Sequence, residues 1–194
     1  MPVGGLCDDP VTALRRGQIV AYPTEAVWGL GVDPWNQLAT ERLLRVKNRP
    51  WHKGLIVVAA DCNQIQPLLE PLKAERRRLL AQTWPGPVTW LIPDPSQWIP
   101  PWVKGDHALV AVRVSAHPVV QSVCRAWGGP VISTSTNRAA APPLQTAQAV
   151  QSEFGDELGC VVRGDTGGMA GPTCIRNLLT GEQVRATGGA GSVC

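Results

Sequence analysis

The chain has 194 residues, of which 44% are hydrophobic and 17% are charged, and its formal net charge is +3. This composition is typical of one globular domain and excludes a largely disordered protein. No apolar run approaches the roughly 20 residues of a membrane span, and the first ten residues lack the basic start of a signal peptide. We therefore expect a cytoplasmic protein with no membrane partner, and the small net charge does not by itself indicate nucleic-acid binding.

Taken in chain order, the first ten residues read as a loose arm, after which hydrophobic periodicity and capping residues predict alternating helices and strands. Pro50 ends one helix, Asp61 caps the next, and a Gly-Gly pair stops a later one. Helices are predicted at 10–17, 35–47, 61–82 (with breaks at two prolines), 118–127 and 146–154. Strands are predicted at 18–22, 55–60, 88–92, 108–114, 131–134, 159–162, 173–178 and 183–185, with irregular loops over 23–34 and 93–102.

The connections between these elements indicate the fold class. Some predicted strands are joined by helices and others by short turns, which favours a mixed sheet over an all-parallel one. We predict an α/β fold in which a single domain, residues 1–186, forms a twisted mixed sheet flanked by helices. A Gly/Ala/Ser-rich segment at 187–194 is expected to be a flexible tail. The helix over 35–47 is expected to bury Leu38, Leu43, Leu44 and Val46 on one face.

The six cysteines and three histidines are scattered along the chain, without any C-x-x-C pair or metal-ligand spacing. A disulfide or metal framework needs tighter spacing or an oxidising compartment. We therefore expect free thiols and no metal ion bound by protein side chains.

Three cations, Lys47, Arg49 and Lys53, follow the predicted helix at 35–47. They could simply form a solvated helix end, where cations complement the helix dipole. Two observations favour an anion site instead: Pro50 fixes an extended segment directly after Arg49, and the cluster leads into a buried strand. Ligands in open α/β folds lie at such strand ends, and closely spaced lysines and arginines hold phosphate oxygens.

Polar side chains on three other segments are further candidates. Arg113 lies within the apolar run A-L-V-A-V-R-V and needs an anionic partner, for which a structural Asp or Glu is the plainest alternative. Ser133, Ser135 and Asn137 share one face if their segment is extended, which suits hydrogen bonding to a ligand. Thr24 could be no more than a turn residue. The glycines at 29 and 31 do not form a complete dinucleotide fingerprint, and the chain contains no P-loop motif.

The string P-T-E-A-V-W-G-L-G-V-D-P, followed by K-N-R-P-W-H-K-G-L-I, resembles the signature of the YrdC/TsaC family of threonylcarbamoyl-AMP synthases. The resemblance continues in order through W-P-G-P-V-T, A-V-R-V-S-A-H-P, S-T-S-T-N and a closing V-R. It implies synthesis of threonylcarbamoyl-AMP and pyrophosphate from L-threonine, bicarbonate and ATP, with Mg²⁺ carried by ATP. The product would pass to a TsaD-type transferase with its accessory proteins, for threonylcarbamoyladenosine modification of tRNA.

The resemblance also implies roles for individual residues. Lys47 and Arg49 would be catalytic and hold the triphosphate. The L-threonine site would use Thr24, Ser133 and Arg113, with Arg113 facing the substrate carboxylate. Further ATP contacts would come from Lys53, Ser135, Asn137 and Arg185, and Thr173 is a weaker candidate.

The sequence departs from the family pattern after Asn137. The family motif is closer to S-A-N-x-S-G, whereas here Arg138 is followed by two alanines. This difference adds weight to one alternative, a nucleotide-binding regulatory domain that has lost activity. A separate alternative, which does not depend on this difference, is an RNA-binding module without catalysis that recognises folded RNA through a basic surface. For the enzyme, we expect tRNA to bind only weakly or indirectly.

Overall fold

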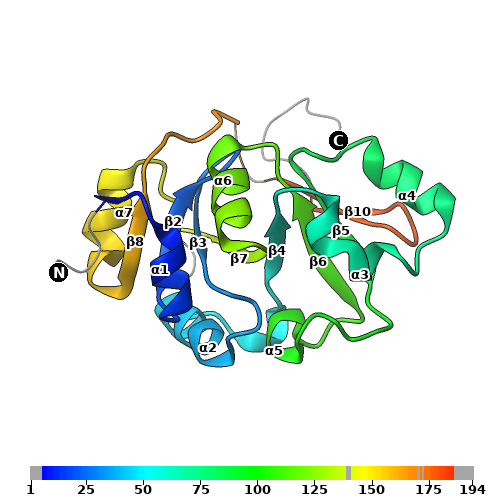
Figure 1. Cartoon of the computed structure of the whole chain (residues 1–194), viewed down its shortest axis with the longest axis horizontal. Helices are drawn as coiled ribbons and strands as arrows, with labels where there is room; N and C mark the ends of the chain where they lie inside the picture. The colour runs from blue at the N-terminus through cyan, green and yellow to red at the C-terminus, as the bar shows by residue number, and fades with distance from the viewer. Residues whose placement is uncertain (1–5, 139–140, 170, 172, 186–194) are drawn as a thin grey trace.

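A ten-stranded mixed sheet forms the centre of the computed structural model, which describes residues 6–138, 141–169, 171 and 173–185 (Figure 1). The strand order is β1-β8-β2-β3-β7-β4-β6-β5-β9-β10, and parallel and antiparallel pairs both occur. This confirms the predicted mixed sheet. The strands are β1 (Leu6–Cys7), β2 (Ile19–Pro23), β3 (Trp28–Gly31), β4 (Ile56–Ala59), β5 (Val88–Pro93), β6 (Leu109–Val114), β7 (Val131–Ser135), β8 (Leu158–Val162), β9 (Cys174–Asn177) and β10 (Gln183–Arg185).

Helices cover both faces of the sheet, because alternate strand residues point to opposite sides. On one face, α1 (Pro10–Arg15) and α6 (Pro118–Trp127) pack on Tyr22, Val58 and Val131 (Figure 1). The opposite face carries the larger core, which includes Val57 and Ile132. The remaining helices are α2 (Gln37–Val46), α3 (Gln66–Leu69), α4 (Ala74–Ala81), α5 (Pro101–Lys104) and α7 (Ala147–Phe154), with 3-10 turns η1 (Trp51–Lys53), η2 (Cys62–Ile65) and η3 (Gly155–Glu157). None of these described helices is long and apolar enough to cross a membrane.

The segment predicted as a loop over 23–34 contains a buried strand, β3, which pairs with both β2 and β7. The segment was predicted as a loop because Gly29 and Gly31 are part of it, and glycine is uncommon in strands. The structure shows why glycine is needed at Gly31. A Cβ atom there would lie 2.5 Å from the carbonyl oxygen of Ile132 and 2.8 Å from the hydroxyl oxygen of Tyr22. The backbone of β7 therefore lies too close to Gly31 for a side chain at this position.

Three other expectations were wrong. The N-terminal arm forms a short parallel pair with β8 from residue 6 onward, and α5 lies in the segment expected to be irregular up to residue 102. Leu38 is 76% exposed, whereas Leu43 and Leu44 are buried, so the inner face of α2 is narrower than its apolar residues suggested. The flexible tail predicted at 187–194 lies outside the described residues.

The prediction of free thiols was wrong for Cys7 and Cys160, which form a disulfide. The parallel pairing of β1 with β8 brings their Cα atoms to 5.6 Å, within the usual range for a disulfide, although 153 positions separate them. Cysteine spacing could not show this, because only the sheet makes them neighbours. Cys174 is disulfide-bonded as well, and Cys62 and Cys124 are free.

This disulfide predicts a redox-dependent stability. Under oxidising conditions, Cys7→Ser should melt about 5–10 °C below the wild type. The cross-link lowers the conformational entropy of the unfolded chain, which raises the free energy of unfolding by about 2–4 kcal/mol. Under reducing conditions, the two melting temperatures should converge. Thermal melts with and without dithiothreitol test this, with Cys62→Ser as the control for loss of a free thiol. A Cys7→Ser protein as stable as the oxidised wild type would contradict the expectation.

Candidate functional site

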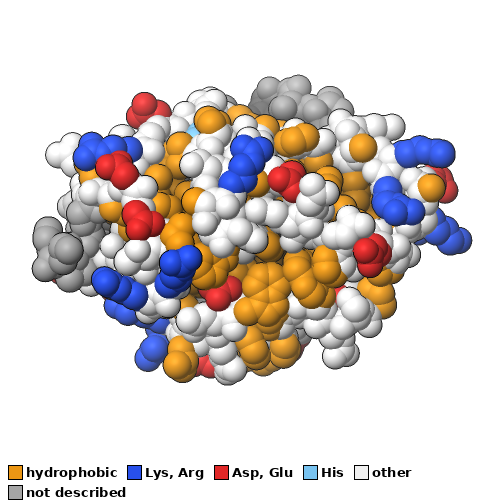
Figure 2. Space-filling view, viewed as in Figure 1, with side chains coloured by type: hydrophobic (Ala, Val, Ile, Leu, Met, Phe, Trp, Pro, Cys, Tyr) orange, Lys and Arg blue, Asp and Glu red, His pale blue; other side chains and the backbone are white. Residues whose placement is uncertain are grey.

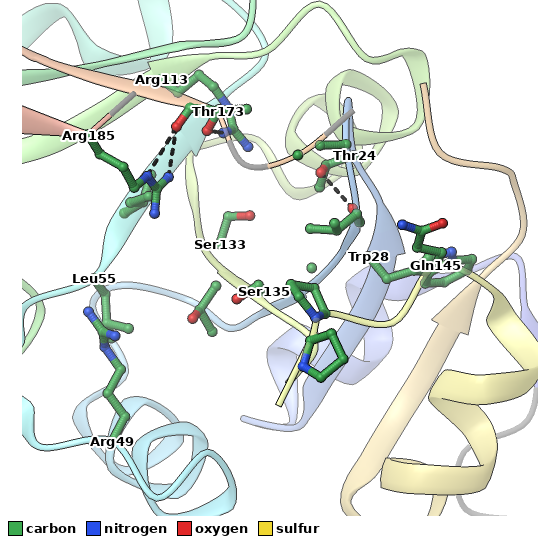
Figure 3. A pocket seen from close by; sticks show the side chains of 18 residues that line it. Thr24, Trp28, Arg49, Leu55, Arg113, Ser133, Ser135, Gln145, Thr173 and Arg185 are labelled. Atoms are coloured by element: carbon green, nitrogen blue, oxygen red, sulfur yellow. Dashed lines mark hydrogen bonds between the residues drawn. The ribbon is translucent and has the colours of Figure 1, made fainter. Parts of the chain in front are cut away.

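A pocket of about 350 Å³ opens in the middle of the sheet, around the strands β3, β7 and β4 (Figure 3). Along β7, Val131, Ser133 and Ser135 alternate with residues of the opposite face, so the two serines point to the side that carries α1 and α6. Arg113 is in register with Val58, which faces the same side. The described lining residues are Thr24, Ala26, Val27, Trp28, Gly29, Arg49, Leu55, Ile56, Arg113, Ser133, Thr134, Ser135, Pro142, Pro143, Gln145, Gly171, Thr173 and Arg185.

Three arginines give the pocket a positive charge. Figure 3 shows Arg113, Arg185 and Arg49 along one side of the cavity, with Trp28 and Gln145 on the other. Burial lowers the pKa of Arg185, and the nearby charges of Arg113 and Arg49 lower it further. No described Asp or Glu lines the pocket. Guanidinium groups that repel one another in a partly desolvated pocket favour an anionic ligand.

Each arginine is held by the surrounding backbone or by a neighbouring side chain. Arg49 Nη2 donates to the carbonyl oxygen of Gly54 at 2.8 Å, across the η1 turn. Arg185 Nη2 donates to the carbonyl oxygen of Thr173 at 2.9 Å, which attaches β10 to the pocket wall (Figure 3). These contacts fix the guanidinium groups while leaving other N–H donors free for a ligand.

Arg113 has both a protein partner and access to the pocket. Its guanidinium lies 3.6 Å from the Glu25 carboxylate, and Nη1 donates to Thr173 Oγ1 at 2.9 Å. Arg113 is 4% exposed and Glu25 is 7% exposed, so this is a buried ion pair. A structural acid, one of the two alternatives for Arg113, is therefore present. The presence of Glu25 does not exclude a ligand carboxylate as a second partner of Arg113, because Arg113 still lines the pocket and Glu25 does not.

Hydroxyl groups complete the polar lining. Thr24 Oγ1 donates to the carbonyl oxygen of Val27 at 2.7 Å, which closes the turn between β2 and β3. Ser133 is buried at the pocket wall, and Ser135 Oγ donates to Asn137 Oδ1 at 2.6 Å. Their oxygen atoms remain possible acceptors for a ligand's N–H or O–H groups.

Lys47, the C-terminal cap of α2, is buried beneath the segment that follows β7. Its ammonium donates to the carbonyl oxygens of Ser135 and Asn137 and to Asn137 Oδ1. An ammonium has three N–H donors, so these acceptors occupy all of them. Burial, and secondarily the charge of Arg49, lowers the pKa of Lys47 to about 8. In this state, Lys47 fixes the turn that carries Ser135 and Asn137.

The lowered pKa of Lys47 predicts an alkaline limit on activity. Below about pH 8 the ammonium is charged and keeps three donors, and above that pH it becomes a neutral amine with two. If the pocket carries the activity that the family resemblance implies, kcat/KM should fall as pH rises through about 8. Lys47→Arg, which stays charged, should move this limit to higher pH. The pH profile should be measured for the wild type and for Lys47→Arg, and an unchanged limit in Lys47→Arg would contradict the assignment of this limit to Lys47.

The structure brings together most, but not all, of the candidate residues. Thr24, Arg49, Arg113, Ser133, Ser135, Thr173 and Arg185 line one pocket. Lys47 and Asn137 lie beneath its wall and contact it through Ser135, whereas Lys53 is exposed and outside the lining. Trp28 and Gln145 also line the pocket, although the sequence did not indicate them. The indole N–H of Trp28 is buried and has no hydrogen-bond partner among the described residues. Glu25 could have been found, because the isolated Arg113 required an acid.

The fold and the pocket together define an α/β protein with a positively charged, hydroxyl-lined ligand site. The chain belongs to the Sua5/YciO/YrdC family, whose model, described as "Telomere recombination", matches residues 12–186.

Relatives in two bacteria carry the name threonylcarbamoyl-AMP synthase. The protein of Chromohalobacter salexigens is 49% identical over 177 residues, which are 91% of this chain and 95% of that protein. The protein of Pseudomonas aeruginosa UCBPP-PA14 is 51% identical over 172 residues, which are 89% and 92% of the two chains.

Solved structures share the fold. Sua5 of P. abyssi, determined in complex with L-threonine, matches with a TM-score of 0.84 and 28% identity. The match covers 92% of this chain but only 53% of Sua5, so this chain corresponds to about half of that protein. E. coli YciO matches with a TM-score of 0.80 and 21% identity, over 92% of this chain and 87% of YciO. The YciO match supports the fold alone.

Proposed function

We propose that this chain is a threonylcarbamoyl-AMP synthase, which converts L-threonine, bicarbonate and ATP into threonylcarbamoyl-AMP and pyrophosphate. The observation that carries the proposal is the convergence of Arg49, Arg113 and Arg185 on one hydroxyl-lined pocket. Relatives of about 50% identity that cover nearly the whole chain bear this name, and the related Sua5 was determined with L-threonine bound.

The reaction needs charge neutralisation more than a covalent catalyst. The neutral amine of L-threonine adds to the carbon of bicarbonate, and loss of water leaves a carbamate anion. A carbamate oxygen then attacks the α-phosphorus of ATP, and the bond to the β-phosphate oxygen breaks to release pyrophosphate. Positively charged groups placed around the phosphates stabilise the charge that develops there, which accounts for a site rich in arginine and hydroxyl groups.

The pocket divides into two parts for these substrates. Arg113, with Thr24 and Ser133, would bind the carboxylate and side chain of L-threonine. Arg49 and Arg185 would contact the phosphates, and Mg²⁺ would arrive with ATP. Lys47 would reach a phosphate oxygen only by releasing one of its present acceptors, so its first role here is to hold the segment from Ser135 to Asn137.

The product identifies the class of partner. A mixed anhydride of a carbamate and AMP is readily hydrolysed, so a second enzyme must consume it quickly. We propose a TsaD-type transferase that moves the threonylcarbamoyl group to a tRNA adenosine, with both proteins in the cytoplasm. In that reducing compartment, Cys7 and Cys160 would be thiols held side by side.

The proposal is tested by incubating the protein with ATP, bicarbonate and L-threonine and following pyrophosphate release. Release should require all three substrates and proceed fully without tRNA. The adenylate itself should be detected by mass spectrometry with ¹³C-bicarbonate, which adds one labelled carbon to the product. Pyrophosphate release that does not depend on L-threonine would contradict the proposed substrate.

The alternative function, an RNA-binding module without catalysis, is not favoured. On the face of the molecule seen in Figure 2, lysines and arginines are interspersed with acidic side chains and do not form one continuous basic surface. Phosphate contacts make affinity fall with salt, by a log–log slope of about −0.7 to −0.9 per neutralised phosphate. The proposed enzyme is expected to bind tRNA weakly and to lose it near physiological salt. Tight binding across a salt series, with no pyrophosphate release in the absence of RNA, would support the module instead.

A further inference from the structure

The buried carboxylate behind Arg113 has an unusual arrangement. Glu25 Oε1 accepts a hydrogen bond from Ser115 Oγ at 2.6 Å, whereas Oε2, the atom nearest Arg113, has no hydrogen-bond partner among the described residues. The gap of 3.6 Å between Arg113 Nη2 and Glu25 Oε2 is within ion-pair range but too long for a hydrogen bond. The hydrogen bond from Ser115 thus keeps the Glu25 carboxylate slightly beyond hydrogen-bonding distance of the Arg113 guanidinium.

Arg113 therefore has its charge balanced while most of its donors stay open. A guanidinium carries five N–H donors, and the hydrogen bond that the structure gives Arg113 is the one from Nη1 to Thr173 Oγ1. Nε is buried and has no partner among the described residues. A bidentate contact with a second carboxylate needs such free, parallel donors. The pocket side of Arg113 is the side where that carboxylate would bind.

The segment around Glu25 is itself fixed. The backbone N–H of Met169 donates to the carbonyl oxygen of Glu25 at 3.1 Å, and that of Gly167 donates to Thr24 at 2.9 Å. A Cβ atom at Gly167 would lie 2.9 Å from the carbonyl oxygen of Glu25, so the two backbones are closely packed. Ser115 Oγ also accepts from the backbone N–H of His117 at 3.1 Å. Both ends of the Ser115–Glu25 contact are therefore anchored.

We propose that Glu25, held back by Ser115, is a positioning residue that keeps Arg113 ready for the substrate carboxylate. Glu25 neutralises the buried guanidinium in the empty pocket, and Ser115 prevents the two from forming a closed pair. When a ligand carboxylate binds, Arg113 is shared between two anions, which limits the affinity and favours release. This inference rests on the proposed function, because it takes the carboxylate of L-threonine as the ligand of Arg113.

Two substitutions should change L-threonine affinity in opposite directions. Glu25→Gln removes the competing charge but keeps a group that can accept from Ser115, so L-threonine should bind several-fold more tightly than to the wild type. Ser115→Ala frees the carboxylate to close on Arg113, so L-threonine should bind several-fold more weakly. Calorimetry with L-threonine measures both affinities, and L-threoninol, which lacks the carboxylate, should show neither effect. Glu75→Gln, at an exposed glutamate on α4, is the matched control for loss of an acidic charge.

Thermal melts give a second readout that a merely structural ion pair would not produce. Without ligand, Glu25→Gln should melt below the wild type, because it leaves a buried cation unpaired. Saturating L-threonine should raise its melting temperature more than that of the wild type, because the ligand supplies the missing anion.

Equal ligand-induced rises, or weaker L-threonine binding in both variants, would overturn the inference. If Glu25→Gln does not fold, Ser115→Ala decides alone, and unchanged or tighter binding there overturns it. If the wild type does not bind L-threonine, the proposed function is overturned together with this inference. If the wild type binds L-threonine but the variants give either of the contrary results above, only the inference is overturned.

Discussion

Replacing Arg113 with methionine is expected to raise KM for L-threonine by about 10- to 150-fold while changing KM for ATP little. A charge-assisted contact with the substrate carboxylate is worth about 1.5–3 kcal/mol, which corresponds to that range. Steady-state measurement of pyrophosphate release, with each substrate varied in turn, gives both constants. Equal changes for both substrates would contradict a role in threonine binding.

The same substitution should also destabilise the fold, which calls for a control. Arg113→Met leaves the Glu25 carboxylate buried without a counter-ion, at a cost of about 3–5 kcal/mol. The double variant Glu25→Gln, Arg113→Met removes both charges and should recover most of the melting temperature but none of the threonine affinity. This pair separates the loss of binding from the loss of stability.

The second large effect is expected at Arg49 and Lys47, which adjoin the same pocket in different ways. Arg49→Met should slow pyrophosphate release by about 10²–10³-fold, because it removes a charge that lines the pocket. It should also lower the melting temperature, because the carbonyl oxygen of Gly54 loses its hydrogen bonds from Arg49. Lys47→Met should slow release as well and also lower the melting temperature. It removes a donor from two carbonyl oxygens and a side-chain oxygen. The carbonyl oxygen of Ser135 keeps the N–H of Asn137 and Asn137 Oδ1 keeps the Ser135 hydroxyl, so the main cost, about 1–3 kcal/mol, falls on the carbonyl oxygen of Asn137.

Arg45→Met is the matched control for this pair. Arg45 lies on α2, close to both residues, but is exposed and does not line the pocket. Its rates and melting temperature should stay near those of the wild type. A Lys47→Met protein that melts like the wild type but is inactive would show that Lys47 acts on the substrate and not on the turn.

Much of the fold could be predicted because its local signals agree with its tertiary structure. The helix at Pro118–Trp127 was predicted with the observed bounds, since proline at its start and glycine after its end are both strong signals. The caps at Asp61 and Thr146 were also confirmed, as each side chain accepts a backbone N–H at the start of its helix or turn. These features depend on neighbours within a few positions of the chain.

What the sequence could not show depends on contacts between distant segments. The glycine-rich strand β3 is stabilised by β2 and β7 on either side, and no local pattern encodes that. The buried pair of Glu25 with Arg113 joins positions 88 apart. The spacing of Lys47 and Arg49 indicated a shared role. Instead, the backbone directs Arg49 into the pocket and turns Lys47 beneath its wall.

The hairpin of β9 and β10 has a consequence for the nascent chain during translation. It adds Thr173 and Arg185 to a pocket whose other arginines are synthesised much earlier, and β9 joins the sheet by pairing with β5. A ribosome that has released only the first 170 residues therefore presents Arg113 without the Thr173 hydroxyl and without the cation of Arg185. Ligand recognition thus begins only after Arg185 has been synthesised, and a chain terminated before Thr173 lacks two of the groups that line the pocket.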